Sequence, residues 1–145
     1  MLIRITNGVP ETYTIGQLRR DNLNVSFPKD IPAKTLEAFG VYEVKELPRP
    51  PFDPETHYLK ASDFYQVEGK WQVHYYPEPL PLAQVKETMQ ARRTNLLAQS
   101  DWIVVVAYER QESVPQEWVA YRQALRDVPA QQDFPYEILW PNKPA

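Results

Sequence analysis

Three potential metal ligands stand close together in the segment DPETH, where Asp53, Glu55 and His57 occupy alternate positions. Carboxylate oxygens and imidazole nitrogens bind zinc and other divalent ions, so this cluster has the right donor types for part of a metal site. A complete zinc site needs further ligands, and the chain has no cysteine and only one other histidine, His74. We therefore expect a solvated turn here and no metal centre.

Residue types that catalyse reactions are present, but not in a recognisable arrangement. The four serines, Ser26, Ser62, Ser100 and Ser113, lie outside any G-x-S-x-G motif, and no histidine is near them in sequence. The four glycines do not group into a phosphate-binding loop. The sequence thus predicts no catalytic residue, no cofactor and no metal, and hence a protein that is not an enzyme.

Large aromatic side chains are concentrated in the C-terminal part of the chain. They are Trp102, Trp118, Tyr121, Phe134 and Trp140. A small unit needs large side chains to fill its core, so most of these rings are expected to be buried. Trp and Tyr also dominate protein–protein contacts, and Trp140, in the C-terminal tail, is the ring most expected to stay exposed. On this hypothesis Trp140→Ala weakens partner binding, and Trp118→Ala unfolds the unit.

Charge and hydropathy argue against two classes of partner. The net charge of −3 is unfavourable for a general nucleic-acid binder, and we expect the basic pairs Arg19-Arg20 and Arg92-Arg93 to lie on solvated faces. The longest uninterrupted apolar run, Trp102–Tyr108, is far too short to span a membrane, and the N-terminus does not resemble a signal peptide. We therefore expect a soluble intracellular protein that binds neither nucleic acid nor membrane.

The first 77 residues have the pattern of a small α+β unit. A β-hairpin is predicted around the turn Glu68-Gly69, with Tyr65, Val67, Trp71, Val73 and Tyr75 on one face. Residues 48–60 are dense in proline and are expected to form an extended connector. The other predicted elements are a strand over 2–5 ending at Asn7-Gly8, a helix over 15–20 capped by Thr14, a helix from Pro32 to Gly40, and a strand over 41–47.

From Leu82 onward the apolar residues recur at helical spacing. This spacing predicts a helix over 82–99, and Val114, Trp118, Tyr121 and Leu125 predict another that begins near Pro115 and ends at Pro129. Residues 102–110 are ambiguous, because three consecutive valines favour a strand while Ser100 and Asp101 suit a helix N-cap. We favour the helix.

The predicted organisation is therefore an α+β domain over 1–77, a Pro-rich linker over 78–81 and a helical domain over 82–145. The helical domain is expected to be a small bundle that ends in an extended strap over FPYEILWP. Alternate prolines at 77, 79 and 81 forbid a helix before Pro81, so the linker is expected to be a semi-rigid spacer.

Three blocks of the C-terminal half resemble the phage tail assembly chaperone family. They are RRTNLLAQSDW (92–102), WVAYRQALRDVP (118–129) and FPYEILWP (134–141). The positions that match the family pattern are Leu96, Leu97, Asp101, Trp102, Trp118, Tyr121, Arg122, Leu125, Arg126, Asp127, Phe134, Pro135, Trp140 and Pro141. The resemblance covers about residues 82–144, and the N-terminal half resembles the leader of longer phage tail-associated proteins. The chain departs from the pattern at IVVVAYERQESVP, where many relatives have a short Pro/Asp-rich turn, and this indicates a variant partner surface.

The resemblance implies a non-enzymatic protein that binds a tail-fibre or other tail polypeptide and assists its folding, oligomerisation or attachment. The alternative is a structural component that stays in the virion at the fibre or baseplate. Candidate partner-binding residues are Trp102, Tyr121, Arg122, Arg126, Phe134 and Trp140. A homo-oligomer is compatible with such a role. The implied location is the host cytoplasm during phage assembly, or the virion tail if the protein is retained.

Overall fold

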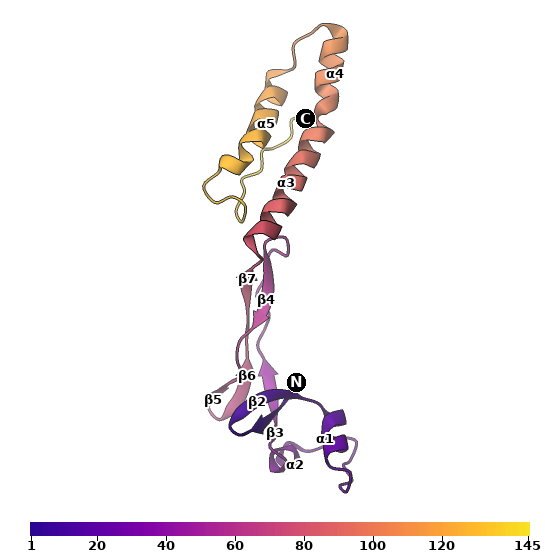
Figure 1. Cartoon of the computed structure of the whole chain (residues 1–145), viewed down its shortest axis with the longest axis vertical. Helices are drawn as coiled ribbons and strands as arrows, with labels where there is room; N and C mark the ends of the chain where they lie inside the picture. Colours follow the sequence, from indigo (N-terminus) through magenta and orange to yellow (C-terminus); the bar gives the residue numbers. More distant parts are fainter. The chain divides into compact units, whose positions relative to one another are not determined.

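The computed structural model describes residues 1–145 and contains both β-sheets and α-helices, which confirms the α+β prediction (Figure 1). The chain forms two compact units. Unit 1 comprises Met1–Phe52 and Leu59–Glu78, and unit 2 comprises Asp53–Tyr58 and Pro79–Ala145. The short segment Asp53–Tyr58 therefore belongs with the helical C-terminal part of the chain.

Unit 1 is built on a five-stranded sheet with the strand order β2-β1-β3-β6-β5. Neighbouring strands are antiparallel, except that β3 and β6 are parallel. Two short helices, α1 (Ile15–Asp21) and α2 (Ala33–Ala38), connect β2 to β3. The strands are β1 (Leu2–Thr6), β2 (Val9–Tyr13), β3 (Val41–Glu46), β5 (Tyr65–Val67) and β6 (Lys70–Val73).

A tight turn joins β1 to β2, a strand that the sequence pattern does not predict. Asn7 and Gly8 have positive φ angles of 52° and 80°, as a type I′ hairpin turn requires. Pro10 lacks a backbone donor and so weakens the strand pattern. Because β2 lies at the edge of the sheet, a proline there leaves no ladder hydrogen bond unmade.

The helix signals of unit 1 are confirmed. The Oγ1 atom of Thr14 accepts a hydrogen bond of 3.1 Å from the backbone N–H of Gln17, which caps α1. Pro32 lies at the N-cap of α2, and Gly40 follows the helix with a φ of 71°. A side chain at this φ would be strained, so glycine suits the change from helix to strand.

The sheet of unit 1 buries apolar side chains on both faces. On one face, Leu18 of α1 and Leu36 of α2 pack with Val41 of β3. Since neighbouring residues of a strand point to opposite faces, Val44 of β3 lies on the other face. There it forms a second cluster with Ile3 and Val73.

The β-hairpin around Glu68-Gly69 is confirmed, but the prediction that its five apolar residues share one face is wrong. Tyr65 pairs with Gln72 and Val67 pairs with Lys70. Residues directly opposite each other point to the same face, so a two-residue turn places Tyr65 and Val67 on the face opposite Trp71. Val67 is accordingly exposed.

A second sheet pairs β4 (His57–Ala61) with β7 (Tyr75–Pro79). Parts of the predicted connector over 48–60 and of the predicted linker over 78–81 are therefore strand. The prolines of β7 argue against a strand in the sequence, but a strand of a two-stranded sheet has one free edge, where a missing N–H costs nothing.

Unit 2 contains three α-helices, of which α3 (Leu82–Gln99) has the predicted bounds. The favoured helix over 102–110 is confirmed as α4 (Asp101–Arg110), and the last predicted helix is α5 (Gln116–Asp127). Only Ser100 separates α3 from α4, and α5 returns alongside them (Figure 1). A 3₁₀ turn (Val128–Ala130) follows, and residues 131–145 contain no further helix or strand.

The core of unit 2 is formed by the predicted face of α5. Trp118, Tyr121 and Leu125 are buried. They pack against partly buried side chains from other segments of the unit, namely Leu96, Leu97, Ile103, Val114 and Trp140. The apolar spacing of α5 in the sequence therefore identifies its inner face correctly.

Candidate functional site

The outer face of α4 carries four large apolar side chains. Trp102, Val104, Val105 and Tyr108 are exposed, with 84% of Tyr108 accessible to solvent. Val104 and Tyr108 are four residues apart and Val105 and Tyr108 three, so these three side chains are neighbours on one face of the helix. Trp102 borders Val105 in the same way. We call these four residues the α4 surface.

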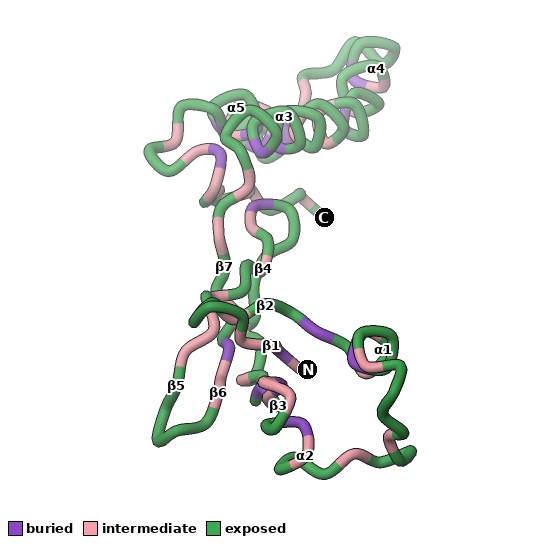
Figure 2. Tube along the Cα trace, turned by 60° about the horizontal axis from the view of Figure 1, so that its bottom comes forward, coloured by how far each residue is buried: buried purple, intermediate pink, exposed green.

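The other apolar residues of α4 explain why the α4 surface is exposed to solvent. Ala107 is the only buried residue of the helix, and Ile103 and Val106 are half-buried. These three residues occupy the side of α4 that packs on the unit. The helix has more apolar side chains than its inward side can bury, and Figure 2 shows most of α4 as exposed.

Arg122 of α5 fixes the start of α4. Its Nη1 atom lies 2.9 Å from Oδ1 of Asp101, 2.6 Å from Oγ of Ser100 and 3.1 Å from the carbonyl oxygen of Leu97. The Arg122 side chain is 13% exposed. A largely buried guanidinium nitrogen thus lies against three oxygen atoms where α3 ends and α4 begins, which holds the two helices against α5.

The junction at Ser100 is satisfied without a side-chain N-cap. Ser100 is buried, and its hydroxyl donates a hydrogen bond of 2.8 Å to the carbonyl oxygen of Leu97. Asp101 occupies the first turn of α4, where a carboxylate is favoured by the helix dipole. Helix α4 therefore starts where Ser100 and Asp101 predict, but the prediction that one of them caps it with its side chain is wrong, because the Ser100 hydroxyl bonds backward to α3.

A series of ring contacts links the α4 surface to the core. The ring of Trp102 meets that of Trp118 edge to face at a centroid distance of 5.6 Å. Trp118 meets Tyr121 in the same manner at 5.9 Å. Trp102 is therefore anchored on one side by Trp118 and exposed on the other.

The C-terminal segment is held on α3 by Trp140. The guanidinium carbon of Arg92 lies 4.8 Å from the centroid of the Trp140 ring, and Nη1 of Arg92 lies 3.0 Å from Oε2 of Glu55. The prediction that Trp140 is the ring that stays exposed is wrong, because Trp140 is half-buried and packs against the core of unit 2, whereas Trp102 is exposed. We therefore expect Trp140→Ala to lower stability as well as any binding.

Side-chain hydrogen bonds close the segment before Trp140 into a loop. The predicted extended strap is wrong for its first half, because residues 134–137 form turns and a bend. Nε2 of Gln131 donates to the carbonyl oxygen of Leu139 at 3.0 Å, and the N–H of Leu139 donates to Oε1 of Gln131 at 2.9 Å. The hydroxyl of Tyr136 donates to the carbonyl oxygen of Leu80 at 2.6 Å. Phe134 is half-buried, and its peptide bond to Pro135 is cis.

The six candidate partner-binding residues do not share one surface. Trp102 and Arg126 are exposed, and Tyr121 lies in the core. Arg122 binds the α3–α4 junction, and the backbone carbonyl of Arg126 accepts a hydrogen bond of 3.2 Å from Arg93. Phe134 and Trp140 are half-buried in the C-terminal segment.

Val104, Val105 and Tyr108 were not predicted as surface residues. The signal was present, because a run of apolar residues without helical spacing cannot be buried on one side of a helix. It becomes readable only once residues 101–110 are assigned as a helix.

The three potential metal ligands of the segment DPETH all make contacts within unit 2. Glu55 pairs with Arg92, and Oδ1 of Asp53 accepts a hydrogen bond of 2.9 Å from the N–H of Glu55. Nδ1 of His57 lies 2.8 Å from Oγ1 of the buried Thr56. No group of three or more His, Asp or Glu side chains is placed to hold a metal ion.

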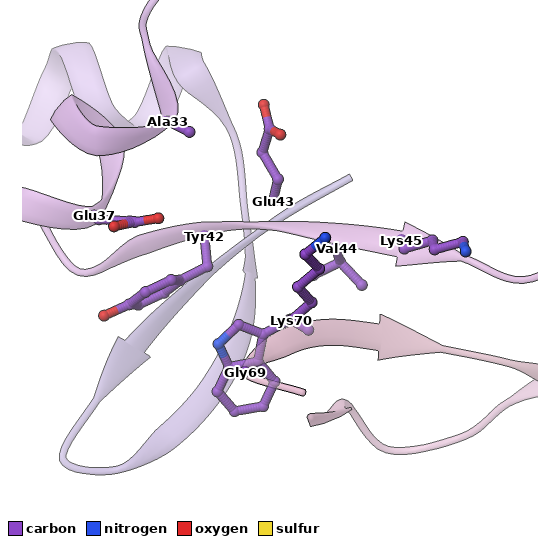
Figure 3. A pocket seen from close by; sticks show the side chains of 9 residues that line it. Ala33, Glu37, Tyr42, Glu43, Val44, Lys45, Gly69 and Lys70 are labelled. Atoms are coloured by element: carbon purple, nitrogen blue, oxygen red, sulfur yellow. The ribbon is translucent and has the colours of Figure 1, made fainter. Parts of the chain in front are cut away.

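A shallow cavity of about 410 Å³ lies in unit 1 (Figure 3). Tyr42 and Trp71 form its apolar wall, with ring centroids 6.4 Å apart. Glu37, Glu43 and Lys70 contribute charges around it. The indole nitrogen of Trp71 is buried and has no hydrogen-bond partner, so it offers no accessible donor to a ligand.

The C-terminal part of the chain, which holds the α4 surface, can be compared with known families. Residues 86–145 match the family of phage tail assembly chaperone proteins. The predicted resemblance of residues 82–144 to this family is thereby confirmed.

The phage tail assembly chaperone match lies entirely within unit 2 and includes α4, α5 and the C-terminal segment. None of the curated proteins and none of the solved structures matches the chain. No helix of the protein has the length and apolar character needed to cross a membrane.

Proposed function

We propose that the protein is a tail assembly chaperone that uses the α4 surface to hold an immature phage tail polypeptide. The observation that carries this proposal is the exposure of Trp102, Val104, Val105 and Tyr108 on one helix. Contiguous exposed apolar side chains are typical of protein-binding sites. The family match of residues 86–145 supports the same role.

The position of the α4 surface supports its use in partner recognition. Val104, Val105 and Tyr108 lie in IVVVAYERQESVP, where the resemblance leads us to expect a departure from the family pattern, and Trp102 directly precedes this segment. The half-buried Arg122 and the Trp102–Trp118 ring contact hold this segment on α5. A surface that is already ordered loses little conformational entropy when a partner binds.

The size of the α4 surface favours reversible binding. A helix of ten residues is about 15 Å long. Stable interfaces bury roughly 20–30 residues on each side, many more than the α4 surface offers. We therefore propose that the protein covers apolar segments of an immature tail-fibre chain and releases them when assembly buries them.

The proposed action is non-catalytic. It requires only that the protein binds the immature polypeptide more tightly than the assembled one, so that free apolar segments stay covered. The candidate ligands Asp53, Glu55 and His57 support this view, because all three are engaged in contacts within unit 2.

Quantitative mass spectrometry of purified phage particles, run beside the lysate of infected cells, tests the proposal. A chaperone that leaves after assembly should be abundant in the lysate and absent from particles. A fixed ratio of this protein to a tail protein in particles would instead identify a structural virion component.

A further inference from the structure

Resting on the proposed function, a further inference concerns the chemistry of the segment that binds the α4 surface. One end of this surface is acidic. Glu109 lies one turn after Val105, Glu112 follows the end of α4, and Glu117 is in the first turn of α5. All three side chains belong to exposed residues.

These carboxylates are not neutralised within the protein. The four ion pairs of the structure involve other residues, and Asp101 at the opposite end of α4 is paired with Arg122. Within residues 109–117 Arg110 is the only basic residue beside the three glutamates, so this stretch carries a net charge of −2. The charge beside the α4 surface is therefore concentrated at its C-terminal end.

Folding does not account for two of these charges. The C-terminal end of a helix carries a partial negative charge, so Glu109 and Glu112 are placed where carboxylates are unfavourable. Glu117 is different, because the first turn of α5 favours an acidic side chain. Glu109 and Glu112 thus have no stabilising partner inside the protein, although a basic partner would provide one.

We propose that the α4 surface binds a client segment in which apolar side chains are followed by lysine or arginine. The apolar side chains would contact Val104, Val105 and Tyr108, and the basic ones would meet Glu109 and Glu112. Opposite charges at the rim of an interface speed association and select among partners. A second copy of the chain is a poorer occupant, because it presents the same carboxylates and a surface too small for a stable dimer.

The test uses the full-length protein and two fluorescent amphipathic peptides of equal length and with identical apolar residues. Their polar positions carry lysine in one peptide and glutamate in the other. At an ionic strength of about 0.01 M, where charges act over about 30 Å, we expect the lysine peptide to bind at least about tenfold more tightly. At about 1 M the range falls to about 3 Å, and the preference should largely disappear.

Two charge variants locate the effect. The double variant Glu109→Gln/Glu112→Gln should lose most of the preference for the lysine peptide. The matched control Glu87→Gln/Glu137→Gln removes two exposed carboxylates elsewhere on unit 2 and should bind both peptides like the unaltered protein. Equal binding of the two peptides by the unaltered protein, or equal effects of the two double variants, would overturn the inference.

A third variant separates this inference from the proposed function. If Val104→Ser/Tyr108→Ser stops binding while the two peptides bind the unaltered protein equally, the docking surface stands and the inference about charge fails. If that variant binds both peptides normally, the docking surface itself is wrong. A dimer by light scattering that Val104→Ser/Tyr108→Ser converts to a monomer would make the surface a self-interface and overturn the inference.

Discussion

The two neighbouring helices α4 and α5 handle their large apolar side chains in opposite ways. In α5, Trp118, Tyr121 and Leu125 lie on one face and are buried. In α4, the large side chains of Trp102, Val105 and Tyr108 are exposed, and the one buried residue is an alanine. Helical spacing of apolar residues thus identifies the helix that builds the core. Apolar residues without that spacing identify a helix that has apolar surface left over.

The largest expected difference between the two helices is in stability. Leu125→Ala removes a fully buried side chain from α5 and should lower the free energy of unfolding by about 2–5 kcal/mol. Val105→Ala on α4, where Val105 is 54% exposed, should change it by less than about 0.5 kcal/mol. Urea titrations followed by tryptophan fluorescence measure both values. Similar losses in the two variants would mean that α4 contributes to the core as α5 does.

The contact of Arg122 in α5 with the start of α4 should have the next largest effect on stability. Arg122→Ala leaves Asp101, Ser100 and the Leu97 carbonyl without their shared donor and should cost about 1–3 kcal/mol. Arg122→Lys should recover only part of this loss, because an ammonium lacks the planar fork of the guanidinium. The exposed Arg126 provides the control, and Arg126→Ala should stay within about 0.5 kcal/mol. If the Arg122→Ala and Arg126→Ala proteins were equally stable, the contact of Arg122 with the start of α4 would not stabilise the fold.

Tyr108 tests whether the exposed side chains of α4 contribute to binding and not to stability. Because this side chain is 84% exposed, Tyr108→Ser should change the free energy of unfolding by less than about 0.5 kcal/mol. The same variant should weaken binding of the lysine peptide about tenfold, equivalent to about 1.4 kcal/mol, since a central aromatic anchor is lost. Tyr58→Ser alters another exposed tyrosine of unit 2 and should leave binding unchanged. Fluorescence anisotropy reports the affinities, and equal affinities for the two variants would remove Tyr108 from the surface.

The smallest effect concerns the end of α4. Gln111 has a positive φ of 56°, and the N–H groups of Gln111 and Glu112 bond to the carbonyls of Tyr108 and Ala107. Gln111→Gly should stabilise the protein by about 0.5–1 kcal/mol, because glycine adopts this backbone conformation without strain. Gln99→Gly, inside the last turn of α3, should destabilise it by about 1 kcal/mol. Thermal unfolding shows whether each variant is more or less stable than the unaltered protein. A change in the same direction for both variants would refute this description of the cap.

The sequence predicted the helices of unit 2 well because their ends and periods are encoded locally. Pro81 and Pro115 precede α3 and α5, and the spacing of Trp118, Tyr121 and Leu125 specifies the inner face of α5. The strands β2 and β7 were missed because Pro10, Pro77 and Pro79 disfavour a strand in any local pattern. Which edge of a sheet a strand occupies depends on distant residues, and so does the tolerance of proline there.

The candidate site was predicted only in part. Trp102 was identified by residue type and is exposed, whereas Tyr121 was identified in the same way and is buried. Arg122 meets Asp101 across 21 positions of the sequence, a contact that no local pattern indicates. Val104, Val105 and Tyr108 could not be placed on a surface until the choice between helix and strand was settled.

Site-specific photo-crosslinking in phage-producing cells tests whether the α4 surface contacts a tail polypeptide. A photoreactive phenylalanine derivative is introduced in place of Tyr108 on the α4 surface and, as a control, in place of the exposed Tyr58. We expect the derivative at position 108 to crosslink to a phage tail polypeptide, identified by mass spectrometry, and the control not to do so. Absence of that crosslink from position 108, or equal crosslinking from both positions, would contradict the claim that α4 holds the partner.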